Sequence, residues 1–186
     1  MPTESTGMSR PAAPGKPFNF AQHLIACNAV RPEKIAFIDD MGSLRYGELA
    51  ERIRRLAAGL LASGVRREER VLLLMHDCSD WPVSFLGAMY AGIVPVAVNT
   101  LLTADDYAFM LEHSRAQAVL VSAALLPLLH EALRKAAHEV KTIIVSHPDA
   151  ALPADAVALD ALIAQHAPLA QPAATSPDDP GFWLYS

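Results

Sequence analysis

Apolar and polar residues recur along residues 47–64 with the spacing of an amphipathic helix. The charged residues of this stretch lie mostly away from the apolar stripe. Gly64 closes the stretch and suits a helix end, because glycine accepts the left-handed backbone conformation common there. We therefore predict a helix with one buried face. The residues of that face are Leu49, Ile53, Leu56 and Leu60.

Four mainly apolar runs predict strands that are buried on both faces, as in a parallel sheet. They span residues 70–77, 94–99, 117–122 and 141–146. Helical patterns separate them, which gives the order β-α-β-α-β-α-β. This order predicts right-handed crossovers and a largely parallel sheet flanked by helices, an α/β fold.

Several of the predicted helices carry start signals. Asp80 is the predicted N-cap of a helix over residues 80–92, with Pro82 in its first turn. Thr103 is followed three residues later by Asp106, which is close to a capping box. Further helices are expected over residues 20–30, 123–139 and 158–166.

Additional strands are expected near the two ends of the sequence. Residues 34–40 and 44–46 have the pattern of a hairpin across Gly42. Residues 182–186, FWLYS, follow a Pro-Gly turn and predict one more buried strand. These strands complete a single α/β unit.

Residues 1–17 differ in composition from the rest of the chain. They are polar and rich in proline, and they lack the charged start and apolar centre of a secretory signal. We therefore expect a flexible N-terminal tail over residues 1–17 and the folded unit over residues 18–186.

Composition and charge narrow the possible partners. The chain has 186 residues, of which 52% are hydrophobic and 19% charged, so it can bury a core. Its net charge is −5 and its basic residues are interleaved with other types, which argues against a nucleic-acid partner. Residues 81–104 carry no charge, but Pro82, Gly92 and Pro95 interrupt them. A helix followed by a strand is therefore expected there, in a soluble protein without a membrane partner.

Ligands of open α/β sheets bind beyond the carboxyl ends of the strands. The candidate positions follow Met75, Val98, Ser122 and Ser146, and include Ser186 itself. Residues 75–80, MHDCSD, could form a Cys/His site around His76 and Cys78, or a polar loop with a helix cap, and we favour the loop.

The remaining titratable residues have simple structural explanations. His113 lies at a predicted helix end, where an imidazolium suits the helix dipole. The pairs Asp39–Asp40 and Asp105–Asp106 lie at a turn and in a first helical turn. The two cysteines, Cys27 and Cys78, match no metal-binding spacing. No phosphate-binding glycine motif or catalytic signature occurs, so the residues alone predict no catalytic residue and no metal site.

Several segments together resemble the N-terminal part of the acyl-adenylate-forming enzymes, which include acyl-CoA synthetases, adenylation domains and luciferases. LRYGELAERIRRLAAGL is similar to the first core motif of that family. LGAMYAGIVPVAVN is similar to the second, with Gly92 and Pro95 at a helix-to-strand corner. The resemblance covers residues 18–186. Within the family, the segments FNFAQHL, LLTADDYAFML and FWLYS are most similar to benzoate–CoA ligases and related aryl-CoA ligases.

This resemblance implies that residues 18–186 are an incomplete N-terminal α/β portion of the adenylation domain, cut at the start of the ATP phosphate loop. Tyr185 and Ser186 match the first two positions of the loop signature. The resemblance assigns Ser186 a hydroxyl that donates to an ATP phosphate, and Tyr185 a role in packing or orienting the loop. The aryl-acid pocket and the catalytic lysine would lie beyond Ser186.

The implied function is ATP-dependent activation of an aryl carboxylic acid, with benzoate favoured, to an acyl-AMP and then to its CoA thioester. Mg²⁺, ATP and coenzyme A would be required, in a cytoplasmic protein that could be a homodimer. The 186-residue stretch alone would be inactive. Two alternatives remain: a non-catalytic binding module with a ligase-like fold, and an unrelated nucleotide-binding α/β enzyme.

Overall fold

The sheet at the centre of the molecule consists of six parallel strands in the order β7-β6-β5-β3-β4-β8. The computed structural model describes residues 17–185. The predicted tail therefore lies outside the described residues except for Pro17, and so does Ser186. The strands of this sheet are β3 (Arg70–Leu74), β4 (Val94–Ala97), β5 (Ala118–Ser122), β6 (Thr142–Ser146), β7 (Ala156–Ala158) and β8 (Trp183–Leu184).

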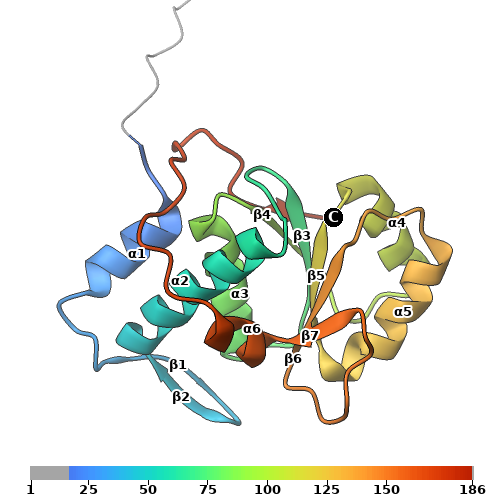
Figure 1. Cartoon of the computed structure of the whole chain (residues 1–186), viewed down its shortest axis with the longest axis horizontal. Coiled ribbons are helices and arrows are strands. Elements are labelled where there is room, and N and C mark those ends of the chain that lie inside the picture. Colours follow the sequence, from blue (N-terminus) through green and yellow to red (C-terminus); the bar gives the residue numbers. More distant parts are fainter. Residues whose placement is uncertain (1–16, 186) are drawn as a thin grey trace, which may run out of the picture.

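Helices cover both faces of the sheet, as Figure 1 shows. One face packs against α1 (Phe20–Asn28), α2 (Tyr46–Ala62), α3 (Asp80–Tyr90) and α6 (Leu159–Gln165). The other packs against α4 (Ala104–Ser114) and α5 (Leu126–Lys135). A separate antiparallel hairpin joins β1 (Ile35–Asp39) and β2 (Gly42–Arg45). The predicted α/β class, with a parallel sheet between helices, is confirmed.

The packing of strand β3 explains why its sequence is apolar after Arg70. Val71 and Leu73 belong to the core on the α2–α3 face, whereas Leu72 and Leu74 belong to the core on the α4–α5 face. All four side chains are fully buried. Because successive side chains of a strand point to opposite faces, a strand covered on both sides has no polar face to show.

The hairpin and the helix that follows it form, but the turn is tighter than predicted. Gly42 is the first residue of β2 and pairs with Asp39 across the turn at residues 40–41, and its φ of 138° favours glycine. Helix α2 buries all of its predicted apolar face, and it ends before Gly64, which has a φ of 84°. Glu48 accepts a hydrogen bond from the backbone N–H of Arg45 over 2.9 Å, so it caps the first turn.

Two local expectations need correction. Strand β7 was not predicted, because a run of Ala-Val-Ala has no distinctive pattern and becomes a strand only by pairing with β6. Asp80 is the first residue of α3 rather than its N-cap, which is Ser79. Pro95 lies within β4, opposite Val71, in agreement with the strand predicted over residues 94–99.

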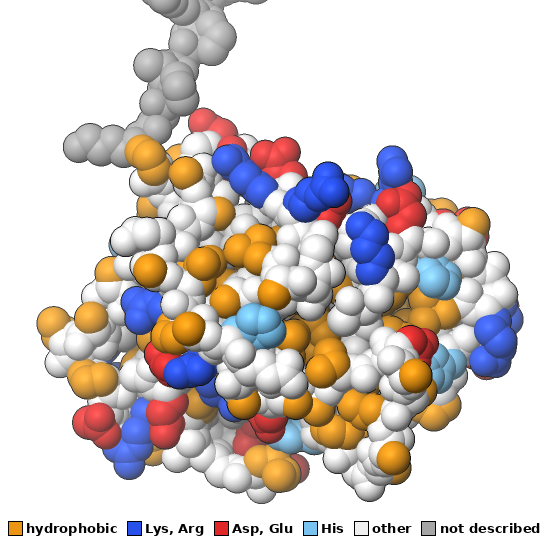
Figure 2. All heavy atoms as spheres, in the orientation of Figure 1, with side chains coloured by type: hydrophobic (Ala, Val, Ile, Leu, Met, Phe, Trp, Pro, Cys, Tyr) orange, Lys and Arg blue, Asp and Glu red, His pale blue; other side chains and the backbone are white. Residues whose placement is uncertain are grey.

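The surface mixes charges of both signs. On the face drawn in Figure 2, the Lys and Arg side chains along the upper edge lie beside Asp and Glu side chains. Over the described residues, none of the helices has both the length and the apolar character needed to cross a membrane.

Candidate functional site

A cavity of about 500 Å³ lies at the carboxyl ends of β3, β4 and β8. We call it the strand-end cavity. Its polar lining includes His76, Asp77, Asn99 and Thr100, and its apolar lining includes Trp81. Parallel strands place their carboxyl ends at one edge of the sheet, which is where α/β proteins bind ligands. The remaining lining residues are Met75, Ala97, Val98, Leu184 and Tyr185.

Next to this cavity lie the carboxyl ends of β3 and β5, where the chain leaves the two paired strands toward opposite sides of the sheet. From β3 the chain passes to β4 on one side, and from β5 it passes to β6 on the other, so a topological switch point lies between them. The hydroxyl of Ser122 occupies this point and accepts a hydrogen bond from the backbone N–H of His76 over 2.9 Å. The open space therefore lies one strand further on, above β3, β4 and β8.

The loop after β4 is held by a buried tyrosine. The Tyr107 hydroxyl donates to the carbonyl oxygen of Asn99 over 2.6 Å and accepts from the N–H of Leu102 over 3.2 Å. Burial is the main cause that raises the pKa of Tyr107. This side chain gives the loop that lines the strand-end cavity a fixed shape.

The capping box predicted at the start of α4 is present. Thr103 Oγ1 accepts from the N–H of Asp106, and the carboxylate of Asp106 accepts from the N–H and the hydroxyl of Thr103. These bonds, chiefly that from the Thr103 hydroxyl, lower the pKa of Asp106. The first turn of α4 is thus anchored directly behind the loop.

Strand β8 brings Tyr185 to the strand-end cavity. Trp183 pairs with Val96 of β4, and Leu184 pairs with Ala97. The Tyr185 hydroxyl points to α4, where it lies 2.9 Å from Nδ1 of His113. Burial is the main cause that raises the pKa of Tyr185. The orienting role assigned to Tyr185 stays a prediction, and Ser186 lies outside the described residues.

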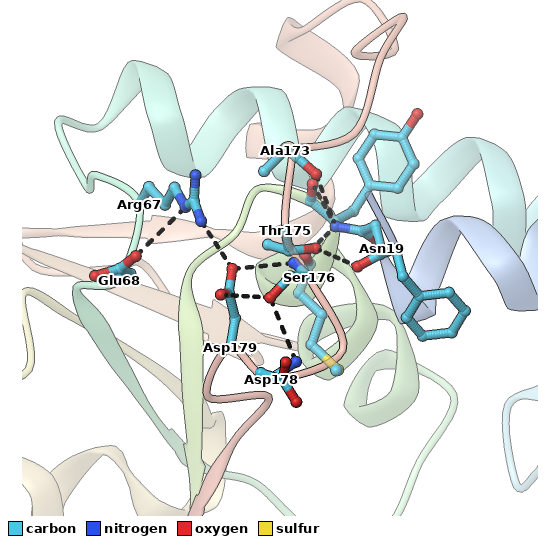
Figure 3. A network of polar contacts seen from close by, with 11 residues as sticks. Asn19, Arg67, Glu68, Ala173, Thr175, Ser176, Asp178 and Asp179 are labelled. Carbon is cyan, nitrogen blue, oxygen red and sulfur yellow. Dashed lines mark hydrogen bonds and ion pairs between the residues drawn. The ribbon is translucent and has the colours of Figure 1, made fainter. Parts of the chain in front are cut away.

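The segment that leads into β8 is tied down by Asn19, as Figure 3 shows. The Asn19 side-chain amide lies 2.9 Å from the carbonyl oxygen of Met89 and 3.4 Å from those of Tyr90 and Ala173. Its Oδ1 accepts from the N–H of Gln22, so it also caps α1. One side chain thus joins the start of α1, the end of α3 and the approach to β8.

A second group of hydrogen bonds holds the same segment closer to β8. The carboxylate of Asp179 accepts from Arg67 over 2.7 Å, and from the hydroxyl and N–H of Ser176 over 2.9 and 3.1 Å (Figure 3). These bonds, with that of the Ser176 hydroxyl first, hold the pKa of Asp179 below its usual value. The turn before β8 is therefore fixed at both of its ends.

The residues of the MHDCSD segment do not gather into a Cys/His site. His76 and Asp77 line the strand-end cavity, whereas Cys78 lines a neighbouring hollow with Trp81 and Phe85. Within residues 17–185, no group of three or more His, Cys, Asp or Glu side chains could hold a metal ion. The polar-loop interpretation is therefore the one that fits the geometry.

Asp80 has a structural task that the sequence did not reveal. Its carboxylate is 4% exposed and accepts from Arg52 and from the Ser146 hydroxyl, each over 2.7 Å, while His147 lies 3.3 Å away. A buried carboxylate requires such partners. This cluster joins α2 and α3 to the end of β6.

Asp39 behaves as the turn interpretation predicts. Its carboxylate accepts from the N–H groups of Met41 and Ser79, over 2.9 and 2.7 Å. The Ser79 bond is the first cause of the lowered pKa of Asp39. The hairpin turn is thereby linked to the loop before α3.

Comparison with known proteins gives consistent matches. Residues 25–186 match the family model described as AMP-binding enzyme. A 4-hydroxybenzoate–CoA/benzoate–CoA ligase of Rhodopseudomonas palustris is 42% identical over 175 residues, which are 93% of this chain and 32% of that protein. A benzoate–CoA ligase of Thauera aromatica is 42% identical over 172 residues, 91% of this chain and 32% of that protein.

A solved structure of a benzoate CoA ligase from Burkholderia xenovorans superposes with a TM-score of 0.83. It is 49% identical and the match covers 90% of this chain and 32% of that one. The chain thus spans about a third of the length of the relatives that it matches.

Proposed function

This chain belongs to the AMP-binding enzyme family, and we propose that the protein containing it is an aryl-acid–CoA ligase. The carboxylate oxygen of the acid attacks the α-phosphorus of magnesium–ATP, which forms an acyl-AMP and releases pyrophosphate. The thiol of coenzyme A then attacks the acyl carbon and displaces AMP. Benzoate and hydroxybenzoates are the substrates named for the relatives, and we favour benzoate.

The observation that carries this proposal is the identity of 42% over almost the whole chain to ligases named for these acids. The strand-end cavity supports it. Strand β8 delivers Tyr185 to the ligand-binding edge of a parallel sheet, next to polar groups from two other strand ends.

Within this chain, we assign Tyr185 and Ser186 to the entrance of the ATP phosphate loop. The Ser186 hydroxyl donates to a phosphate oxygen, and Tyr185 orients the loop. No residue of the chain is assigned to a chemical step. For reactions at phosphorus, positioning and charge stabilisation supply most of the rate enhancement, and we place the groups that do this, with the aryl-acid pocket, outside the chain. Magnesium enters with ATP as part of the substrate.

The proposal extends to the setting of the protein. ATP and coenzyme A are the co-substrates, and we propose a cytoplasmic homodimer. Light scattering coupled to gel filtration tests the dimer, because a mass of one subunit at micromolar concentration would contradict it.

The function is tested by acid-dependent exchange of labelled pyrophosphate into ATP. The complete protein containing this chain is assayed with benzoate, 3-hydroxybenzoate, 4-hydroxybenzoate and a medium-chain fatty acid. We expect exchange with benzoate to exceed exchange with the fatty acid at least tenfold, and residues 1–186 alone to give none. Exchange with the fatty acid only would overturn the substrate class. An absence of exchange with every acid would favour a binding module with a ligase-like fold.

A further inference from the structure

Helix α4 places two hydrogen-bonding groups against the end of β8. Nδ1 of His113 lies 2.9 Å from the Tyr185 hydroxyl, and the carbonyl oxygen of Met110 lies 3.4 Å from the same hydroxyl. His113 and Tyr185 are 72 residues apart in the sequence. The Tyr185 side chain is therefore held at one point on α4 by long-range contacts.

Aromatic packing fixes the orientation of both rings. Phe109 stacks on His113 with ring centroids 5.5 Å apart, and Tyr185 meets both rings edge-on, at 5.7 Å from His113 and 6.3 Å from Phe109. On the strand before it, Trp183 lies under the guanidinium of Arg70 at 5.5 Å. Trp183 of β8 and Tyr185, which directly follows β8, thus both make specific contacts on the α4 side of the sheet.

His113 reaches the strand-end cavity only through Tyr185. It is not among the residues that line the cavity, whereas Tyr185 is. The helix-dipole interpretation explains its place in the last turn of α4, but not its contact with Tyr185. A role in the site would therefore have to be exerted through the tyrosine.

Building on the proposed function, we propose that His113 is a positioning residue for the ATP phosphate loop. Its bond to the Tyr185 hydroxyl restricts the side-chain rotamer of Tyr185, and the rotamer in turn restricts the backbone angles with which the chain leaves β8. With the bond removed, the loop entrance adopts more orientations, and binding of the ATP phosphates must select one of them. The affected substrate is ATP rather than the aryl acid.

The test compares His113→Phe, Tyr185→Phe and the double variant in the complete ligase. Phenylalanine keeps the aromatic packing at either position but removes the hydrogen bond. We expect each single variant to raise the KM for ATP about three- to tenfold and the KM for benzoate less than twofold. The double variant should match the singles, because both changes remove one and the same bond. His138→Phe, which replaces an exposed histidine in the loop between α5 and β6, is the matched control and should change neither KM.

A structural role alone would give a different result. It would lower the melting temperature and kcat without changing the KM for ATP. The positioning role is overturned if His113→Phe leaves that KM unchanged in an active enzyme, or if the effects of the two single variants multiply in the double variant.

A spectroscopic comparison separates this proposal from the proposed function. The ¹⁵N chemical shift of His113 Nδ1 should move in Tyr185→Phe, since it reports the hydrogen bond of that nitrogen, and an unchanged shift would overturn the proposal whatever the activity. If the shift moves but the wild-type protein catalyses no acid-dependent exchange, the bond exists, and the proposed function fails together with the ATP role that rests on it.

Discussion

Replacing Asn19 by alanine should destabilise the fold more than the loss of an ordinary helix cap. The side chain is 8% exposed, caps α1 through Oδ1, and donates from Nδ2 to the end of α3 and to the segment before β8. At the end of α3 the Met89 carbonyl oxygen accepts from the N–H of Gly92 over 3.0 Å, and Asn19 supplies it with a second donor.

The magnitude follows from these two tasks. Loss of the cap costs about 1 kcal/mol. The Met89 carbonyl oxygen keeps its bond from the Gly92 N–H, so loss of the 2.9 Å bond from Asn19 costs about 0.5–1.5 kcal/mol more. The two contacts at 3.4 Å add little, because one amide with two hydrogens cannot serve three acceptors fully. We expect a total of about 1.5–2.5 kcal/mol.

The assay is a urea titration followed by circular dichroism, with two companion variants. Thr103→Ala removes the N-cap of α4. This cap is exposed and, unlike Asn19, donates no hydrogen bond to a distant part of the chain, so its loss should cost only about 1 kcal/mol. Asn19→Asp keeps the acceptor for Gln22 but turns an oxygen toward the carbonyl groups, so it should be no more stable than Asn19→Ala. Equal losses for Asn19→Ala and Thr103→Ala, or a wild-type midpoint for Asn19→Asp, would refute this reasoning.

Three further predictions concern other parts of the fold. Gly92→Val should cost about 2–4 kcal/mol in a urea titration, because Gly92 has a φ of 72° and an added Cβ would lie 2.7 Å from Cβ of Ala173. Tyr107→Phe should speed hydrogen exchange at the Leu102 amide and cost about 1–3 kcal/mol, because it leaves the Asn99 carbonyl unpaired. Asp179→Asn should be less stable than wild type at pH 6. Folding lowers the pKa of Asp179, so the charged carboxylate contributes its full stabilisation above the ordinary pKa of 3.8. This stabilisation is lost as the pH falls through the lower pKa of the folded state, and the stability difference between Asp179→Asn and wild type should shrink over that range.

Each of these predictions has an outcome that contradicts it. An unchanged urea midpoint for Gly92→Val would show that the segment carrying Ala173 can move aside without loss. Unaltered exchange at Leu102 would remove the support that we assign to Tyr107. A stability difference for Asp179→Asn that stays constant from pH 6 to pH 3 would show that the stabilisation does not come from the charge of Asp179.

The regular elements could be predicted because their signals are local. The stripe from Leu49 to Leu60 needs only a helical period, and Thr103 with Asp106 needs only a spacing of three. The apolar run that follows Arg70 in β3 indicated a sheet covered on both faces. By contrast, β7 is a strand only because it pairs with β6. Asp80 is not the N-cap of α3, and its carboxylate instead accepts hydrogen bonds from Arg52 and Ser146, which are distant in the sequence.

The place of the candidate site, but not its contacts, follows from sequence reasoning. The rule for parallel sheets points to the strand ends, where the cavity lies, and the position of Tyr185 follows from β8; that a ligand binds there stays a prediction. The contact of Tyr185 with His113 depends on the crossover that lays α4 against the β8 edge, which no local pattern encodes. The same holds for Asn19, whose cap is a local feature but whose bond to Met89 spans 70 residues.

The most direct test of aryl-acid activation follows an oxygen atom. The complete protein containing this chain is given benzoate labelled with ¹⁸O in its carboxylate, together with magnesium–ATP and coenzyme A, and the AMP released is weighed by mass spectrometry. If a carboxylate oxygen attacks the α-phosphorus, that ¹⁸O stays on phosphorus when the thiol displaces AMP. We therefore predict AMP that carries one ¹⁸O in place of one ¹⁶O. Unlabelled AMP formed alongside benzoyl-CoA, or no AMP at all, would contradict the adenylate mechanism.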